Sequence, residues 1–397
     1  MEILVVGAGI GGLALARGLC ADGHGVRVLE RGPDPATGGA AVTIFSNGAA
    51  AASGLGVHID GLGGRIDGLV LRRDTGRTLM RTDLRPLRSK TGFAVRTVPR
   101  GELIERLGQG LDPDQVRYNT PVVAVHGDGA GAVVEVGGDG LLGADVVVGA
   151  DGYRSAVRAS ILSDGPPTEV GWTTWQGLGP TVADVAGGTT GQLLVGSAGL
   201  VGLMPAGNGL TQWWFDVRRS PSALDASDPS ADPLAPSSAG EMLVWLRDVF
   251  GGYATPVPEL LATISPDELG CFPHLLRDPT APWGRGPVTL LGDAAHAFPP
   301  SQAQGANQAL EDAWLLRRTL AQPPSRDGDL AATLRRYEQR RATRVQLISR
   351  MAGSERTNRP PGIALGFLAR TIPASVAGRG YLRLIRRISS VLHDDRL

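Results

Sequence analysis

The sequence predicts an α/β fold in two parts, in which a parallel nucleotide-binding sheet is interrupted by a second, mainly antiparallel sheet and followed by C-terminal helices. Three observations predict it. The chain opens on an apolar run, a glycine-rich loop and a helical stretch; short β-like runs fill its middle; and a helical pattern follows residue 308. A chain of 397 residues also exceeds one ordinary core and normally divides into two domains.

The N-terminal segment follows the pattern of one strand–helix–strand unit. Apolar residues 3–6 predict a strand, residues 13–22 a helix and residues 26–30 a second strand. The first loop has the G-x-G-x-x-G pattern, which lets the backbone approach a pyrophosphate at the helix N-terminus. Glu30 is expected to accept hydrogen bonds from a ribose. This motif predicts a Rossmann-like domain and leaves FAD and NAD open. The expected loop contacts are Gly7, Gly9, Ile10, Gly11 and Gly12.

Strand-like stretches continue along the chain and indicate two sheets. A stretch at residues 288–291 comes late and is expected to rejoin the first sheet. Residues 170–279 change to short β-like runs broken by Gly and Pro, which is typical of a second sheet. A run rich in Pro, Ser and Asp at residues 220–239 predicts an exposed loop. The other predicted strands are residues 122–125, 132–136, 144–148, 192–195, 200–204 and 210–217.

These patterns predict three parts of the chain. Residues 1–169 and 280–350 are expected to form one discontinuous nucleotide-binding domain. Residues 170–279 are expected to be an inserted substrate-binding sheet, because they interrupt the strands of that domain. Residues 351–397 are expected to be a C-terminal helical segment.

Composition is typical of a soluble globular protein and leaves small neutral or weakly acidic ligands open. Hydrophobic residues make up 42% and charged residues 20%, and the formal net charge is +0, whereas a nucleic-acid surface normally needs a basic excess. Cys20 and Cys271 have no metal-ligand spacing and cannot build a disulfide framework, so we expect no metal. The same cysteine usage fits a reduced cytoplasmic setting. The lack of a leader-like start and of an apolar run of about 18 residues predicts neither secretion nor a transmembrane segment. We expect a monomer or homodimer.

Two later motifs each place an aspartate just beyond a strand, where α/β sheets bind ligands. The sequence GADGYRS at residues 149–155 follows one apolar run, and GDAAH at residues 292–296 follows another. With these three motifs in order, the chain resembles the group A flavoprotein monooxygenases, the family of para-hydroxybenzoate and salicylate hydroxylases, from Met1 to about Arg350. The resemblance implies a GR2-type FAD-binding domain.

The resemblance also implies roles for particular residues. Asp151, with Gly152, would serve both FAD and NAD(P)H, and Asp293 would bind the ribityl chain of FAD. His296 would belong to the structural frame of its loop. The further FAD contacts that the resemblance implies are Arg31, Thr43, Arg100 and Val122. Arg100 suits the FAD phosphates because an otherwise neutral chain needs local cations to meet a diphosphate.

The segment at residues 299–307 leads into a helix and is expected to reach the flavin ring. Small residues would let backbone amides approach the ring, and the helix N-terminus would stabilise negative charge on reduced flavin. Family members usually carry glycine where this chain has Ala303. The expected flavin contacts here are Gly305, Ala306 and Asn307.

Substrate recognition is expected in the second sheet, at the aromatic strand QWWF of residues 212–215. Alternation along a strand puts Gln212 and Trp214 on one face. This part of the chain resembles the FAD-dependent urate hydroxylases, which would put that face inward. Those enzymes orient urate with an arginine where this chain has Leu200, so an apolar pocket for a larger aromatic or polyketide-like substrate is favoured. The substrate-pocket candidates are Gln212, Trp214, His274 and Pro300.

The function implied by the resemblance is that of a single-component monooxygenase in bacterial natural-product biosynthesis. NADPH or NADH would transiently reduce FAD, O2 would form a C4a-hydroperoxyflavin, and its terminal oxygen would hydroxylate the substrate. No catalytic side chain is assigned. Alternatives are a flavin epoxidase or Baeyer-Villiger-type oxygenase, a flavin-binding protein that does not oxygenate, and an NAD-only dehydrogenase. The arginine-rich residues 335–344 and 383–387 predict solvated faces, with a peripheral membrane contact as the alternative.

Overall fold

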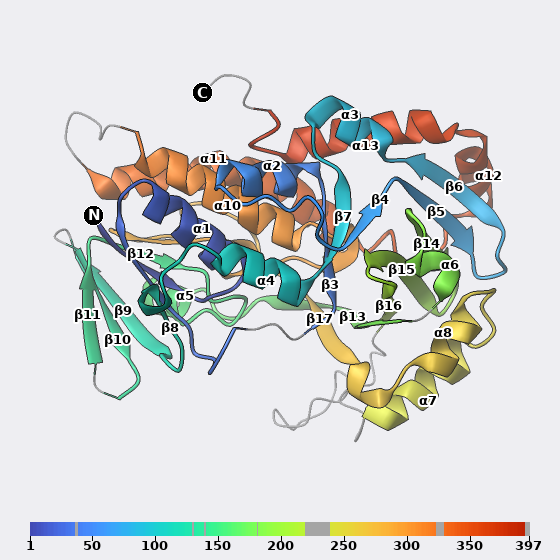
Figure 1. Ribbon diagram of the computed structural model, residues 1–397, viewed down its shortest axis with the longest axis horizontal. Coiled ribbons are helices and arrows are strands. Elements are labelled where there is room, and N and C mark those ends of the chain that lie inside the picture. Colours follow the sequence, from blue (N-terminus) through green and yellow to red (C-terminus); the bar gives the residue numbers. More distant parts are fainter. Residues whose placement is uncertain are drawn as a thin grey trace.

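The computed structural model describes residues 1–35, 39–128, 131–138, 140–180, 182–218, 239–322 and 329–393 (Figure 1). The loop predicted at residues 220–239 lies outside the described residues, except for its last position, which begins a helix. No helix in the described ranges is long and apolar enough to cross a membrane.

A five-stranded parallel sheet forms one end of the molecule, with the order β18-β12-β1-β2-β8. Its strands are β1 (Glu2–Val6), β2 (Gly25–Leu29), β8 (Val116–Arg117), β12 (Val146–Gly149) and β18 (Val288–Leu290). The valines of β12 are buried on both faces, as expected of a covered parallel sheet. The late strand β18 pairs with β12, which confirms that it rejoins the first sheet.

A small antiparallel sheet lies beside the parallel one, at the lower left of Figure 1. It contains β9 (Val122–Asp128), β10 (Gly131–Val136) and β11 (Gly140–Ala144). The predicted strand at residues 144–148 is therefore divided, because Ala144 closes the hairpin with β10 and Val146 begins β12.

The second large sheet has seven strands in the order β17-β13-β16-β15-β14-β5-β6. They are β5 (Gly68–Arg73), β6 (Thr78–Asp83), β13 (Thr168–Gly179), β14 (Thr190–Val195), β15 (Gly199–Gly207), β16 (Leu210–Arg218) and β17 (Gly270–Leu276). All neighbours are antiparallel except β14 and β5. The sheet thus extends beyond the predicted insertion, because the β5–β6 hairpin satisfies the open backbone groups at the edge of β14.

Helices α7 (Ala239–Phe250) and α8 (Val257–Thr263) cover one face of the second sheet (Figure 1). Trp213 and Phe215 of β16 pack there, with the ring centroids of Phe215 and Phe250 5.1 Å apart. The opposite face, which carries Gln212 and Trp214, is turned toward the rest of the molecule.

A fourth sheet has three strands in the order β3-β7-β4 and packs against β15 of the second large sheet. Its strands are β3 (Ala41–Ile44), β4 (Gly64–Ile66) and β7 (Val95–Pro99). Helix α6 (Ala183–Ala186) packs against β14, β15 and β16 of the second large sheet. The remaining described helices before residue 300 are α1 (Ile10–Ala21), α2 (Ser46–Gly54), α3 (Arg85–Thr91), α4 (Arg100–Gly108), α5 (Ala156–Ile161) and α9 (Asp293–His296).

Four helices complete the chain: α10 (Gly305–Leu320), α11 (Leu330–Gly353), α12 (Ile363–Thr371) and α13 (Ala374–Ile388). Helix α10 packs against α1 and α2, and α11 against α10 (Figure 1). Helix α13 lies on the edge strand β6 so closely that a Cβ on Gly378 would be 2.0 Å from the carbonyl oxygen of Asp83. The C-terminal helices therefore cover an edge of the second sheet.

Candidate active site

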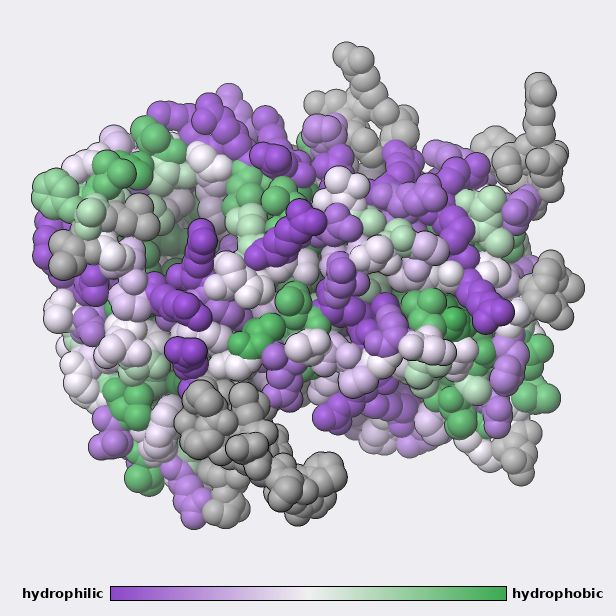
Figure 2. Space-filling model, turned by 180° about the vertical axis from the view of Figure 1, so that it is seen from behind, coloured by the Kyte–Doolittle hydropathy of each residue, from purple (hydrophilic) through white to green (hydrophobic). Residues whose placement is uncertain are grey.

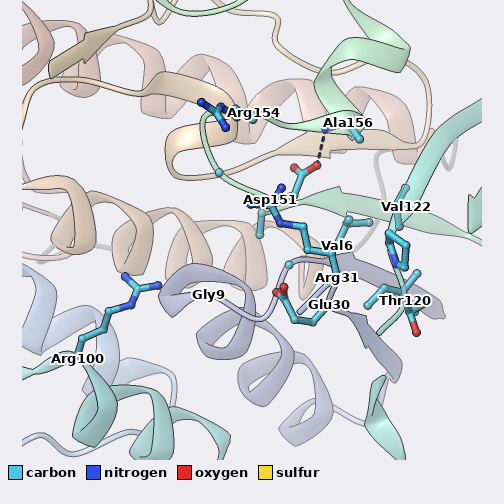
Figure 3. Close-up of a pocket in the computed structure, with 15 residues that line it drawn as sticks. Val6, Gly9, Glu30, Arg31, Arg100, Thr120, Val122, Asp151, Arg154 and Ala156 are labelled. Atoms are coloured by element: carbon cyan, nitrogen blue, oxygen red, sulfur yellow. Dashed lines mark hydrogen bonds between the residues drawn. The ribbon is translucent and has the colours of Figure 1, made fainter. Parts of the chain in front are cut away.

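A cavity of about 280 Å³ lies at the carboxyl ends of β1, β2 and β12 (Figure 3). The fold brings many of the predicted cofactor contacts to its wall, namely Gly7, Gly9, Glu30, Arg31, Arg100, Val122 and Asp151. The wall also contains four residues that were not predicted as contacts, Thr120, Pro121, Arg154 and Ala156. Arg154 lies within the GADGYRS motif, so its closeness in sequence to Asp151 could have predicted it as a cavity residue.

The glycines of the first loop have different physical roles. Gly7 adopts a φ of +104°, and a Cβ there would lie 2.5 Å from the carbonyl oxygen of Ala150. A Cβ on Gly12 would lie 2.0 Å from the carbonyl oxygen of Gly7. A Cβ on Gly9 would meet no atom within 4 Å, so its side faces open space at the cavity. Gly7 and Gly12 permit the turn itself, while Gly9 leaves room for a ligand at the start of α1.

Glu30 stabilises the turns on both sides of the cavity. Its carboxylate accepts the amide of Ala8 at 2.8 Å and that of Gly32 at 2.9 Å. A carboxylate can accept about four hydrogen bonds, so acceptor capacity remains for the hydroxyl groups of a ribose. Glu30 and Arg31 lie together near the rim in Figure 3.

Asp151 caps α5 with one oxygen and leaves the other without a partner. Oδ2 accepts the amides of Ala156 at 2.7 Å and Val157 at 3.2 Å. Oδ1 is buried and has no hydrogen-bond partner among the described residues. Burial raises the pKa of this carboxyl, although its hydrogen bonds counter the effect. A buried acceptor without a partner in the wall of a cavity fits a hydroxyl or amide group of a ligand.

The charges of Arg100 and Asp293 attract each other across this region. Burial lowers the pKa of Arg100, while the charges of Asp293 and Glu30 raise it. Burial raises the pKa of Asp293, while His296 and Arg100 lower it. The Asp293 side chain is nevertheless accessible to solvent. A side chain that is surrounded by protein and still accessible to solvent lies in the wall of a cleft. A ligand in such a cleft could therefore contact Asp293.

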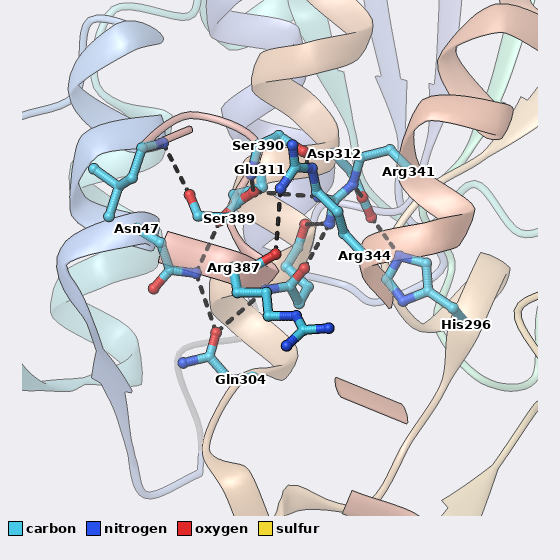
Figure 4. A network of polar contacts seen from close by, with 12 residues as sticks. Asn47, His296, Gln304, Glu311, Asp312, Arg341, Arg344, Arg387, Ser389 and Ser390 are labelled. Carbon is cyan, nitrogen blue, oxygen red and sulfur yellow. Dashed lines mark hydrogen bonds and ion pairs between the residues drawn. The ribbon is translucent and has the colours of Figure 1, made fainter. Parts of the chain in front are cut away.

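Asp312 of α10 stabilises the turn at Gly292 and Asp293. Figure 4 shows Asp312 next to Arg341, with a contact to His296. Oδ2 of Asp312 accepts the amide of Gly292 at 2.8 Å and contacts Nε2 of His296 at 2.7 Å. Oδ1 of Asp312 accepts Nε of Arg341 at 2.5 Å. His296 is almost fully buried. It therefore belongs to the frame of the turn, as the family resemblance implies.

Arg341 extends this network to the end of the chain. Its guanidinium contacts Oε2 of Glu311 at 3.2 Å and donates to Oγ of Ser390 at 2.9 Å. Glu311 also accepts from Nδ2 of Asn47 at 2.9 Å and from the amide of Ser390. The prediction of a solvated arginine face at residues 335–344 is wrong for Arg341, whose side chain is fully buried. Helical periodicity turns this position of α11 toward α10.

The segment expected at the flavin ring is fixed by Asn307. Its Nδ2 donates to the carbonyls of Thr43 and Ala303, both at 2.9 Å, and its Oδ1 accepts the amide of Phe45 at 2.8 Å. Ala303 adopts the left-handed conformation, with φ 49° and ψ 34°, that glycine favours. Gly305 and Ala306 form the first turn of α10, and a Cβ on Gly305 would meet no atom within 4 Å.

The substrate-pocket candidates differ in their surroundings. The Nε2 of Gln212 donates to the carbonyl of Ala41 at 2.7 Å, and its buried Oε1 has no partner among the described residues. Trp214 lies across Gly202, where a Cβ would be 2.1 Å from the indole. Pro300 is exposed and begins a 3-10 turn. None of the candidates lines the cavity of Figure 3.

His274 is fully buried, and both of its ring nitrogens contact polar side chains. Its Nδ1 contacts Oε1 of Glu355 at 2.6 Å, and its Nε2 contacts Oγ1 of Thr174 at 2.7 Å. Thr174 in turn donates to Asp216 at 2.5 Å. Burial lowers the pKa of His274, but Asp216 and Glu355 outweigh it and raise the pKa to about 9. His274 therefore links β17 and β13 to the chain that follows α11.

Sequence comparison identifies the family. The FAD binding domain family matches residues 1–235 and 274–352. The chain belongs to this FAD-binding family. FAD is the cofactor of this flavoprotein, and the resemblance to the group A flavoprotein monooxygenases is confirmed. The chain is an enzyme of the FAD-dependent monooxygenase family.

Three relatives of this flavoprotein show the extent of the similarity. An aurachin C monooxygenase/isomerase of Stigmatella aurantiaca is 30% identical over 350 residues, which cover 87% of this chain and 86% of that protein. An FAD-dependent urate hydroxylase of Klebsiella oxytoca is 32% identical over 352 residues, which cover 87% of each. Klebsiella pneumoniae HpxO complexed with FAD and uric acid gives a TM-score of 0.85 at 27% identity, covering 98% of this chain and 97% of that one.

Proposed function

We propose that this flavoprotein uses NAD(P)H and O2 to hydroxylate an aromatic or polyketide-like small molecule. One observation carries the proposal: the predicted flavin segment and the aromatic strand meet on β3. Asn307 donates to the carbonyl of Thr43, and Gln212 donates to the carbonyl of Ala41, two positions away on the same strand. A substrate bound at this junction would lie against both the flavin segment and the second sheet.

The cavity suits the ADP half of FAD by the chemistry of its wall. The amides at the start of α1 and the guanidinium of Arg100 would hold the pyrophosphate, and Glu30 would hold a ribose. Asp293 would accept a hydroxyl group of the ribityl chain. When bound, FAD supplies the redox chemistry that connects NAD(P)H with O2. The N-terminus of α10 would stabilise negative charge on the flavin ring.

An apolar substrate is favoured by the sheet face that carries Trp214. Leu200 and Met204 of β15 are buried, and Leu200 stands where urate hydroxylases have an arginine. The Oε1 of Gln212 is an acceptor without a partner among the described residues. A buried acceptor is left unsatisfied unless the ligand donates to it, so this chemistry selects an aromatic molecule with a hydrogen-bond donor. Urate, which is polar on every edge, is a poor match.

The test is a substrate screen with the FAD-loaded protein. Candidate aromatics are scored by stimulated oxidation of NADPH and of NADH, followed by product mass with labelled O2. We expect one labelled oxygen atom in the product. Reduction of FAD that never leads to labelled product would contradict the proposal. The position of the new oxygen separates hydroxylation from epoxidation or Baeyer-Villiger insertion.

A further inference from the structure

The charge of the C-terminal segment is strongly one-sided. The whole chain is neutral, with 39 basic and 39 acidic residues. Between Glu355 and Asp394, however, the sequence contains no acidic residue. The same segment carries arginine at positions 356, 359, 370, 379, 383, 386 and 387. Such a local excess of one sign in a neutral protein indicates a surface for a partner of the opposite charge.

Helix α13 displays most of this charge along one side. Its buried residues are Gly378, Leu382, Ile385 and Ile388, which face the edge of the second sheet and α11. The exposed side follows the same helical spacing and carries Arg379, Arg383 and Arg386. Helix α13 is therefore an amphipathic helix whose polar side is cationic.

Helix α12 places exposed apolar side chains beside this charge. Phe367 and Leu368 are 66% and 59% exposed, and Ile372 and Val376 at the junction with α13 are also exposed. Figure 2, seen from behind, shows hydrophobic surface gathered at the upper left, at the end of the molecule where α12 lies, with hydrophilic surface beside it. Neighbouring exposed apolar groups normally mark an interaction site.

A hollow next to α13 adds further basic groups. Its volume is about 490 Å³, and it is lined by Arg65, Asp67, Arg85, Arg88, Ser89 and Gly92. It adjoins α13 through α3, where Arg386 donates to the carbonyl of Lys90 at 3.4 Å. Arg65 pairs with Asp67, and Arg85 with Asp83. Exposed ion pairs contribute little stability, so an incoming phosphate can exchange with these carboxylates.

We propose that α12, α13 and α3 form a peripheral docking surface for an anionic lipid bilayer. The exposed Phe367 and Leu368 would enter the acyl boundary, while the arginines of α13 and α3 meet lipid phosphates. Charge opposes a two-fold pairing with a second copy of the chain, because such an interface would set this basic face against itself. The apolar pair favours lipid over nucleic acid, whose binding surfaces are polar and basic.

The test is binding of the FAD-loaded protein to vesicles. Partitioning is measured by co-sedimentation with phosphatidylcholine vesicles and with vesicles that also contain phosphatidylglycerol. We expect binding only with phosphatidylglycerol, and weaker binding as salt rises. Changing Arg379, Arg383 and Arg386 to Gln should weaken partitioning about 100-fold, or about 3 kcal/mol at roughly 1 kcal/mol per residue. The double change Phe367→Ser and Leu368→Ser should also weaken it, by at least about tenfold.

Each variant has a matched control that makes the same change in net charge, or the same number of apolar-to-Ser changes, elsewhere on the surface. Changing Arg285, Arg340 and Arg350, which are exposed elsewhere, to Gln should leave partitioning unchanged. Changing the exposed Val244 and Trp245 of α7 to Ser should also leave it unchanged. Circular dichroism and bound FAD verify that each variant folds. No binding to either vesicle, equal binding to both, or self-association that depends on the α13 arginines would overturn the proposal. Vesicle binding is independent of turnover, so its failure is distinguishable from failure of the proposed activity.

Discussion

The Nε2 of His296 lies 2.7 Å from Oδ2 of Asp312, and the same oxygen accepts the amide of Gly292. Burial raises the pKa of Asp312, but His296 and Arg341 outweigh it and hold the pKa at about 2. The aspartate is therefore ionised, and its charge orients the turn that presents Asp293.

Asp312→Asn should destabilise the protein by roughly 3–5 kcal/mol, because it removes a buried carboxylate that pairs with both Arg341 and His296. It should also weaken FAD binding through the displaced turn. Urea unfolding and FAD titration measure the two effects. As a control, Asp22→Asn removes a partly exposed ion pair with Arg317 and should cost less than about 1 kcal/mol. Equal effects of the two changes would refute the structural role of Asp312.

Gly9→Ala and Gly12→Ala should separate cofactor binding from folding. A Cβ at Gly9 meets no protein atom, and its φ of −77° suits alanine, so the FAD-free protein should keep its stability. Its affinity for FAD should fall at least about tenfold, because the methyl group occupies ligand space. Gly12→Ala should lower the melting temperature of the FAD-free protein. Flavin fluorescence measures the affinity for FAD, and thermal unfolding measures the stability of the FAD-free protein. Wild-type affinity in Gly9→Ala would contradict the assignment of this loop to FAD.

The His274 cluster predicts a loss of stability at alkaline pH. The folded pKa of about 9 lies above the ordinary value of 6.5, so the imidazolium contributes its full stabilisation below pH 6.5. That contribution, of about 3 kcal/mol, declines as pH rises toward about 9. Urea unfolding at a series of pH values should show this decline in the wild type and a flatter profile in His274→Gln. Parallel profiles would show that His274 does not bind the extra proton.

Ala303→Gly should stabilise the protein by up to about 1 kcal/mol, because alanine in the left-handed region is strained. The gain is limited by the greater freedom of glycine in the unfolded chain. Thermal unfolding of the FAD-free protein measures the change. Ala306→Gly, inside the first turn of α10, is the matched control and should destabilise instead. A loss of stability in Ala303→Gly would mean that the methyl group contributes packing here.

The sequence predicts those parts of the fold whose signals are local. The strand, glycine loop and helix from Glu2 to Ala21 follow from periodicity and from the turn that only glycine allows. Asp151 and Asp293 are recognisable because each follows the carboxyl end of an apolar strand. The hairpin of β5 and β6 is missed, since its partner β14 is distant in sequence and pairing register is not encoded in a local pattern.

Side chains whose role depends on tertiary contacts are also missed. Arg341 lies in an arginine-rich run that predicts a solvated surface. The packing of α11 on α10 instead buries it between Glu311 and Asp312. The position of His274 near the substrate stays a prediction, but its partners within the protein are not evident from the sequence. Both ring nitrogens of His274 contact side chains within the protein, those of Glu355 and Thr174. Glu355 belongs to a segment whose sequence pattern predicts no clear secondary structure.

The pairing of β5 with β14, and of β12 with β18, has a consequence for synthesis on the ribosome. Each early strand emerges well before its partner, so neither large sheet can close until much of the remaining chain has been translated. The nascent protein therefore carries unpaired strand edges for a long interval and cannot mature one domain at a time. Slower translation would prolong that interval and with it the exposure of these edges to aggregation.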